Sequence, residues 1–538
     1  MSDAVADQPG FEVAERLLPT APAGGDYNVL PYRSVPYAQS QPAHLAAVAR
    51  MFGLSAPDPH TASVLELGCA AGGNIIPLAV RHPEARFLGV DLTERQVADG
   101  QARIAALGLS NIEIRQGDIA TVDLSGETFD YMICHGTYSW IPPEAQDAVM
   151  RLTAETLSPE GVAYVSYNTF PGWHLRNIVR DACIYHAGTG GSPEHRVARA
   201  RWALEKLATL SPETTPYGQA LRNEAKLNAT LPDSYILGEF LAEHNAPCHF
   251  HEFVERAALH GLHYLAETDI ASSIPELLEP GTAEAIRQIA GGSGMAAEQY
   301  MDFFVGRQFR RTLLVKRDGI SRSLGPHSLT DLHLTSLLRR DEEKDEGSEK
   351  RAYASPRGTI HVASRPLITL LDGLEEAAPG TVSTETMLDM LPASDEVRVE
   401  ALKAVFRLVL TGHVDVAAVP LAVGRASDER PEIWEPARIE AAAQQSWVSS
   451  LRHAPVGLSV NVAPLLPLID GTRTHAELVR EAGALVANGT VRVKGFDPVV
   501  QSTDVATGAL GQIGASIIEQ VLGFAKRSAL LAPKTNAS

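Results

Sequence analysis

The chain has 538 residues, a mass of 57.7 kDa and a formal net charge of −19, and 45% of its residues are hydrophobic. This length predicts about three or four domains, and the composition is ordinary for a globular protein. The acidic balance argues against nucleic acid as the main partner, because phosphate binding needs a basic face, and it is compatible with a lysine-bearing protein.

The chain opens with a segment over 1–25 that is small, acidic and interrupted by Pro and Gly, which is typical of a flexible terminus. This segment lacks the basic start and apolar core of a signal peptide, and no apolar run approaches the ~20 residues of a membrane-spanning helix. The cysteines have no metal-ligand spacing, which indicates reduced thiols and no metal site. We therefore expect a cytoplasmic protein without membrane insertion. The cysteines are Cys69, Cys134, Cys183 and Cys248.

A tyrosine-rich segment follows over 26–42. Tyr27, Tyr32 and Tyr37 stand among prolines, a pattern that excludes a helix and is too aromatic for a linker. We expect an ordered arm that lies over a ligand pocket; tyrosines packed on the domain surface are the equal alternative. The apolar spacing over 44–54 then predicts a helix that leads into a first strand.

A glycine-rich turn follows that first strand, within the stretch 63–74. A second apolar run, 87–91, ends in an acid, so the order is strand, turn, helix, strand. The turn has the pattern Glu-x-Gly-x-x-x-Gly-Gly, starting at Glu66, rather than the G-x-G-x-x-G of dinucleotide folds. A carboxylate there would repel a pyrophosphate and attract an ammonium group. The turn therefore favours a ligand with an amino-acid moiety over a dinucleotide.

This turn resembles motif I of the class I S-adenosylmethionine (SAM) methyltransferases. The resemblance implies that Asp91 binds ribose hydroxyls and that Asp118, within 116–119, accepts from the adenine amino group. The resemblance also matches 129–135 to the fourth strand and 161–167 to the fifth. SAM is then the cofactor and S-adenosylhomocysteine the product. The residues expected to bind SAM are Tyr27, Tyr32, Glu66, Gly68, Gly72, Asn74, Asp91, Leu92, Asp118, Ile119 and His135.

Two more strands are needed to complete such a sheet. Apolar runs predict a sixth strand at 261–266 and a seventh at 312–316. The amphipathic stretch 175–247 then becomes a helical insertion above the carboxyl ends of the strands. This insertion fits three roles equally well: a lid, a substrate cradle and a dimerisation hairpin. A homodimer is therefore one of the alternatives.

The last third of the chain follows a charged run over 339–351, which predicts a solvated linker. Beyond it, a weak repeat relates 366–373 to 464–471 and predicts two winged-helix-like modules. The expected recognition helices carry no Lys/Arg stripe, which favours contact with protein over DNA. The expected segments are a flexible 1–25, a SAM-binding core 26–174, the insertion 175–247, a middle region 248–325, the linker 326–355, and modules 356–430 and 431–538.

The region from Tyr27 to Lys316 is similar to the SAM-dependent methyltransferases that carry a methyltransferase regulatory domain. The similarity rests on Tyr32, Tyr37 and the segments 134–142, 167–173, 249–253 and 299–314. The best-known members are the rickettsial protein-lysine methyltransferases of outer membrane protein B, which this chain resembles over nearly its whole length. The resemblance implies an α/β class I Rossmann-like sheet of seven strands with a helical insertion, followed by α+β winged-helix-like modules. It also implies a protein substrate with acceptor lysines.

Methyl transfer to lysine requires a neutral amine, and deprotonating a lysine at pH 7 costs roughly 4–5 kcal/mol. An aromatic channel lowers this cost by desolvation. We expect Tyr138 and Trp140 to form channel walls, and Tyr167 or Asn168 to accept a hydrogen bond from the amine. His135 as a base is the alternative to its contact with the cofactor.

Three functions fit the residues. The first is a protein-lysine N-methyltransferase, which the large accessory region favours. The second is a small-molecule methyltransferase, and the third is a regulator that binds SAM and transfers nothing.

Overall fold

The computed structural model describes residues 29–320, 324–345, 350–493 and 503–534. The chain separates into two compact units. One comprises Met1–Pro31 and Val179–Leu241, and the other Tyr32–Ile178 and Ala242–Ser538. The predicted flexible terminus, 1–25, and Tyr27 lie outside the described residues.

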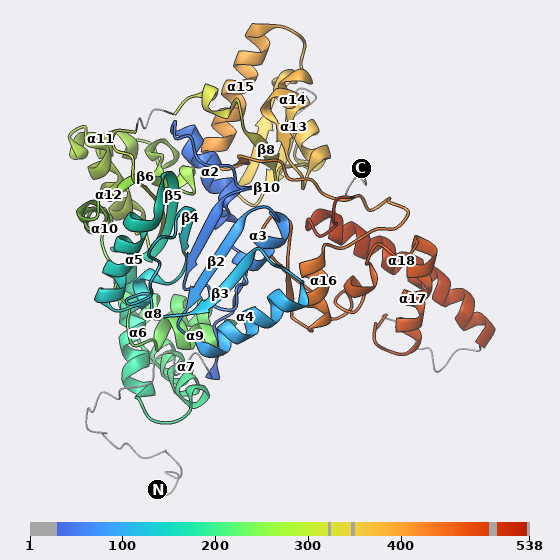
Figure 1. Ribbon diagram of the computed structural model, residues 1–538, viewed down its shortest axis with the longest axis horizontal. Helices are drawn as coiled ribbons and strands as arrows, with labels where there is room; N and C mark the ends of the chain where they lie inside the picture. The colour runs from blue at the N-terminus through green and yellow to red at the C-terminus, as the bar shows by residue number, and fades with distance from the viewer. Residues whose placement is uncertain (1–28, 321–323, 346–349, 494–502, 535–538) are drawn as a thin grey trace, which may run out of the picture. The chain divides into compact units, whose positions relative to one another are not determined.

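A seven-stranded sheet forms the centre of the larger unit, in the order β3-β2-β1-β4-β5-β7-β6 (Figure 1). The first five strands pair in parallel, and β7 runs antiparallel to both β5 and β6. The predicted seven-stranded sheet is therefore confirmed, with the sixth and seventh strands within three residues of the predicted bounds at each end, whereas the sequence analysis had not located β3. The strands are β1 Ser63–Leu67, β2 Arg86–Asp91, β3 Ile112–Gln116, β4 Phe129–Cys134, β5 Leu157–Asn168, β6 His263–Glu267 and β7 Phe309–Val315.

Each face of this sheet packs on helices. Alternate side chains of a strand point to opposite faces, and here both faces are buried, so the strands read as nearly continuous apolar runs. One face, with Val64 and Tyr164, contacts α2, α3 and α4; the other, with Leu65 and Tyr167, contacts α5 and α10. Up to β7, the helices of this unit are α2 Pro42–Met51, α3 Ile75–Arg81, α4 Glu94–Ala106, α5 Pro143–Thr156, α10 Phe250–Leu259, α11 Thr282–Ala290 and α12 Gly294–Val305, and the residues of α6 Trp173–Ala187 are divided between the two units.

The smaller unit contains the middle of the predicted helical insertion. Ser192 caps α7 and Thr215 caps α8, each accepting a hydrogen bond from a backbone amide of the first turn. Its own apolar core includes Val197, Leu221 and Phe240, all at most 1% exposed. Its helices are α7 Pro193–Leu210, α8 Pro216–Asn228 and α9 Asp233–Phe240.

The prediction of a charged linker over 326–355 is wrong. Strand β8 lies within it and forms the centre of a three-stranded sheet, β12-β8-β13. The prediction rested on the charged side chains of this segment. Its scattered apolar residues, such as Leu334 and Tyr353, are buried, and their packing stabilises the strands. The first winged-helix-like module therefore begins at β8. Its elements are β8 His333–Ser336, β9 Arg339–Arg340, β10 Arg351–Ser355, β11 Gly358–Val362, α13 Arg365–Ala377, β12 Val382–Ser383, α14 Thr384–Asp389, α15 Asp395–Leu410 and β13 Val414–Ala417.

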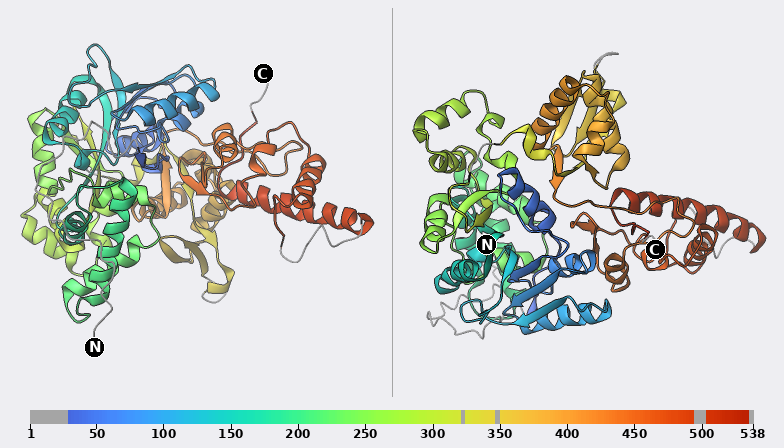
Figure 2. Two further views of the ribbon diagram at one scale, coloured as in Figure 1. Left: turned by 90° about the horizontal axis from the view of Figure 1, so that it is seen from below. Right: turned by 45° about the horizontal axis from the view of Figure 1, so that its top comes forward.

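The last part of the chain is a winged-helix domain with its own apolar core, which includes Ile433, Leu466, Leu478 and Val521. Figure 2 shows α17 and α18 packed along each other. No helix of the described ranges is long and apolar enough to span a membrane. The elements are α16 Glu435–Ala442, β14 Trp447–Ser449, β15 Pro455–Gly457, α17 His475–Ala487 and α18 Thr503–Arg527.

Candidate cofactor and acceptor site

The turn between β1 and α3 forms an open cradle of backbone at the carboxyl edge of the sheet. Gly68 has φ +75° and Gly72 has φ +70°, both in the left-handed region. A Cβ on Gly68 would overlap the Thr137 side chain, and one on Gly73 would overlap the backbone of Ser34. The glycines therefore let the loop after β4 and the N-terminal arm approach this turn closely.

Glu66, on β1 directly before the turn, is a buried carboxyl group that has no cationic partner among the described residues. It is 3% exposed, and its Oε1 accepts a hydrogen bond of 2.8 Å from Nδ2 of Asn74. No described residue donates to its Oε2. Burial raises the pKa of Glu66 to about 8; the Asn74 hydrogen bond lowers it, and the charge of Asp91 raises it. A ligand that brings an ammonium group to Oε2 fits this carboxylate.

Asn74 has its side chain committed to the protein. Its Oδ1 lies 3.0 Å from the backbone nitrogen of Tyr37 and 2.8 Å from Nε2 of His453. With Nδ2 on Glu66, the amide has protein partners at both ends. The contact of Asn74 with the cofactor stays a prediction, and the structure shows Asn74 as a link between Glu66, the arm and His453.

Two more acids stand at the neighbouring strand ends. Asp91 ends β2 and is held by amide donors, Ala70 N to its Oδ2 at 2.8 Å and Thr93 N to its Oδ1 at 2.9 Å. Burial raises the pKa of Asp91, and these amides oppose the rise. Asp118, after β3, is exposed and its Oδ1 accepts from Ala120 N at 2.9 Å.

The two predicted apolar cofactor contacts lie beside these acids. Leu92 is 40% exposed, and Ile119 is 8% exposed. The exposed side chain of Leu92 therefore provides an apolar surface next to Asp91, near the glycine-rich turn.

The N-terminal arm lies against the glycine-rich turn, as the sequence predicts. The carbonyl oxygen of Tyr32 accepts from Nε2 of Gln96 at 3.1 Å, and Ser34 Oγ accepts from Gly73 N at 2.7 Å. The Tyr37 ring lies 3.7 Å from the ring of His135, centroid to centroid.

His135, at the end of β4, is a neutral side chain. Its Nδ1 is 2.7 Å from the hydroxyl of Tyr164, and no described residue bonds to its Nε2. Burial, with a contribution from Arg311, lowers the pKa of His135 to about 3. A histidine with this pKa is a weak base, which argues against the alternative in which His135 acts as the base; its contact with the cofactor stays a prediction.

The prediction of Tyr138 and Tyr167 at the acceptor channel is wrong. Both are 1% exposed, and both rings pack on Phe253 of α10, at 5.4 Å and 3.9 Å. Successive residues of β5 alternate between the two faces of the sheet. Tyr167 therefore joins the core, whereas Tyr164 and Ser166 point to the face that holds His135 and the loop after β4. A period-two reading of β5 would have found these two residues.

Trp140 lies in the loop after β4 and Asn168 at the end of β5, and their roles toward the acceptor stay predictions. Trp140 is half-buried, with its ring edge-on to Trp173 at 5.7 Å. Asn168 ends β5; its backbone nitrogen donates to Ser139 Oγ, and its Nδ2 donates to Oδ1 of Asn245 at 3.1 Å. No described residue donates to Asn168 Oδ1. Asn245, which the sequence analysis missed, thus orients an amide oxygen at the sheet edge.

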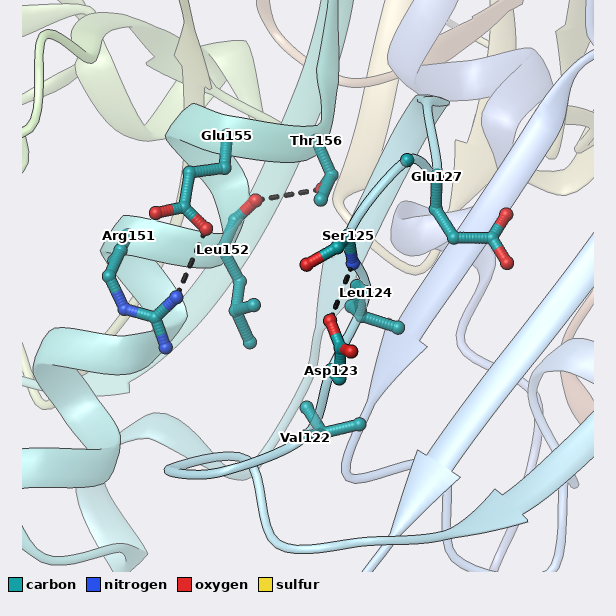
Figure 3. A pocket seen from close by; sticks show the side chains of 10 residues that line it. Val122, Asp123, Leu124, Ser125, Glu127, Arg151, Leu152, Glu155 and Thr156 are labelled. Atoms are coloured by element: carbon teal, nitrogen blue, oxygen red, sulfur yellow. Dashed lines mark hydrogen bonds and ion pairs between the residues drawn. The ribbon is translucent and has the colours of Figure 1, made fainter.

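A hollow elsewhere on the domain is a separate feature (Figure 3). Its walls are the segment 122–127, which precedes β4, and 151–156, which precedes β5. It therefore lies at the amino ends of these strands, whereas parallel sheets bind ligands at the carboxyl ends. In it, Asp123 accepts from Ser125 N at 2.9 Å, and Arg151 pairs with Glu155 at 3.0 Å.

A buried ion cluster joins β6, β7 and α12. Arg310 is 1% exposed; its Nε is 2.9 Å from Asp302, its Nη1 is 2.8 Å from Glu267, and its guanidinium lies 4.0 Å above the ring of Phe250. This cluster ties the last two strands together and has a structural role.

The comparisons with known proteins agree with this geometry. Residues 64–161 match the family described as methyltransferase domain, residues 232–316 the predicted methyltransferase regulatory domain, and residues 429–530 the PKMT C-terminal winged helix domain. An uncharacterized protein of Rickettsia prowazekii, RP789, is 29% identical over 516 residues, 92% of each chain. A second one, RP028, is 35% identical over 232 residues, which cover 93% of that protein and 43% of this chain.

A solved structure, that of PKMT2 from Rickettsia typhi in complex with AdoHcy, matches with a TM-score of 0.80 and 27% identity, over 93% of this chain and 100% of that one. The fold and the turn define a class I SAM-dependent methyltransferase. Within this class, the chain belongs to the family that carries a methyltransferase regulatory domain and includes the rickettsial relatives.

Proposed function

We propose that this protein transfers a methyl group from SAM to the amine of a lysine side chain in a protein substrate. The observation that carries the proposal is the buried, unpaired carboxylate oxygen of Glu66 beside the glycine cradle, one strand from Asp91. The similarity to PKMT2, which extends through the winged-helix domain, favours a protein acceptor.

The proposed cofactor contacts follow the strand ends in order. Glu66 Oε2 accepts from the ammonium of the methionine moiety, and Asp91 accepts from the ribose hydroxyls. Asp118 accepts from the adenine amino group. The absence of a side chain at Gly68 lets the backbone approach the ligand, and the remaining contacts are assigned to Tyr32, Gly72, Leu92, Ile119 and His135. Tyr27 remains a prediction.

The acceptor side must deliver a neutral amine in line with the sulfonium methyl group. In the transfer, the nitrogen–carbon bond forms as the carbon–sulfur bond breaks, and the amine proton leaves to solvent. We propose that Asn168 Oδ1 accepts a hydrogen bond from the amine and so directs its lone pair. The half-buried Trp140 removes water from one side, which lowers the cost of deprotonation.

The experiment is incubation of the purified protein with methyl-labelled SAM and two fractions, cell-surface proteins and small metabolites. We expect label on a protein band and, by peptide mass spectrometry, a methylated lysine. Label confined to the small-metabolite fraction would contradict the protein acceptor. Binding of SAM without any transfer would contradict the enzymatic function itself. The D91A variant serves as the inactive control.

A further inference from the structure

The segment 447–453 of the winged-helix domain contacts the surroundings of the glycine-rich turn at three places. The Arg33 guanidinium of the arm lies 5.1 Å above the ring of Trp447. Nη1 of Arg81, at the end of α3, donates to the carbonyl oxygen of Leu451 at 3.2 Å. His453 Nε2 is 2.8 Å from Asn74 Oδ1.

The last of these contacts adds a donor to an Asn74 oxygen that already accepts from the arm, from Tyr37 N at 3.0 Å and from Ser40 Oγ at 3.1 Å. The backbone nitrogen of Tyr37 can only donate, so the side-chain atom beside it must be the oxygen, Oδ1. His453 must then donate from Nε2 to the same oxygen. His453 is 2% exposed and burial lowers its pKa to about 3, so it is the neutral Nε2–H tautomer. The amide nitrogen of Asn74, Nδ2, therefore points to Glu66 and donates to its Oε1.

A second link between the same domain and the turn is chemically independent. Arg103 of α4 pairs with Glu440 of α16 at 2.7 Å and donates to the carbonyl oxygen of Ala71, in the turn, at 3.3 Å. Glu440 is 2% exposed and also accepts from the backbone nitrogen of Ser449 at 2.6 Å. Figure 1 shows α16 beside α4. A buried pair of this kind is costly to break, because either charge alone would be left without a partner.

We propose that the C-terminal winged-helix domain is part of the cofactor site, with His453 as a positioning residue that orients Asn74 and, through it, Glu66. The inference rests on the proposed role of Glu66 toward the SAM ammonium. The donor on Asn74 occupies Oε1 of Glu66 and keeps Oε2 directed at the cradle. Without His453, the Asn74 oxygen keeps its donors from Tyr37 and Ser40 but loses the one at the shortest distance, so Asn74, and Glu66 through it, is held less firmly.

The test measures SAM affinity by calorimetry on the full chain. His453→Ala is expected to weaken binding about tenfold, the effect of one buried hydrogen bond. His453→Gln supplies an N–H donor and is expected to restore most of the affinity. The backbone at position 453 has φ +58°, in the left-handed region. Ala and Gln have a similar strain energy in this conformation, so the two variants are matched.

The control is Arg452→Ala, at the adjacent position. Arg452 pairs with Asp415 at 3.0 Å and contacts the first winged-helix-like module, not the turn. This variant is expected to bind SAM within about twofold of wild type. In the double variant H453A/N74A, the loss should equal that of N74A alone, because His453 acts through Asn74.

Thermal melting without SAM establishes that each variant is folded. Equal affinity of wild type and H453A would overturn the inference. An H453Q variant as weak as H453A, or R452A as weak as either, would also overturn it, because the effect would then be general loss of packing. Failure of the wild-type protein to bind SAM would instead overturn the proposed function.

Discussion

The β1–α3 turn and the ends of β4 and β5 lie at the same sheet edge, yet they differ in how their side chains are arranged. At the turn, function is carried by backbone conformation and by acids whose positions follow directly from the strand ends. At β4 and β5, successive residues alternate between the two apolar cores on opposite faces of the sheet, and only the Tyr164 face leads to His135. The cofactor side of such an enzyme is thus set by local sequence, whereas the acceptor side depends on register and on distant partners.

The largest expected effect concerns the cofactor side. Asp91→Ala removes the proposed acceptor of both ribose hydroxyls, and hydrogen bonds to a charged group contribute ~1.5–3 kcal/mol each, so SAM affinity should fall by about 100-fold or more. Isothermal calorimetry measures this loss.

The matched control for this variant is Asp123→Ala at the opposite edge of the sheet. Asp123 also accepts from a backbone amide two residues on, but it is fully exposed and distant from the cradle. An Asp91 variant that binds SAM as tightly as the Asp123 variant would refute the ribose role.

On the acceptor side, Asn168→Ala should lower kcat by about 10- to 100-fold, because it removes the hydrogen bond that we propose orients the amine. SAM affinity should stay within about threefold, since the proposal assigns Asn168 to the acceptor and not to the cofactor. Steady-state kinetics together with calorimetry separate the two quantities. A change in SAM affinity as large as the change in kcat would show that Asn168 acts on the cofactor and would contradict its assignment to the acceptor.

Tyr167 provides the contrast within the same strand. Tyr167→Ala should reduce the free energy of unfolding by ~3–5 kcal/mol, because it leaves a cavity beside Phe253. Tyr167→Phe should cost about 1 kcal/mol and leave kcat unchanged. A lower kcat in the folded Tyr167→Phe variant would contradict this assignment and show that Tyr167 contributes to the reaction.

The smallest effect is the pH dependence that Glu66 confers. Its pKa in the folded, cofactor-free protein is about 8, above the ordinary value of 4.5, so its neutral form is favoured by folding. Its contribution to stability is therefore fully present below about pH 4.5 and lost as the pH rises through about 8. Relative to Glu66→Gln, the melting temperature of the cofactor-free wild type should decline across this window. Parallel profiles of the two proteins would contradict the raised pKa.

The sequence predicted the turn, the seven-stranded sheet with six of its strands located, and the family, because few folds place glycines and an acid directly after a strand in this order. It failed where side-chain direction or distant packing decides. Tyr167 and Tyr164 differ only in which face of β5 they occupy, and neighbouring aromatic residues obscured the alternation. Asn245 and His453 lie 77 and 379 residues from their partners in the site, and no local pattern marks them. The strand β8 was not predicted, because the charged residues around it indicated a solvated linker.

The most direct test of the account is a structure of this protein with S-adenosylhomocysteine bound. We expect the ammonium of the ligand within about 3.2 Å of Glu66 Oε2, a hydrogen-bond distance, and the ribose hydroxyls on Asp91. A ligand bound away from the β1–α3 turn, or one whose ammonium leaves Glu66 Oε2 without a partner, would contradict it.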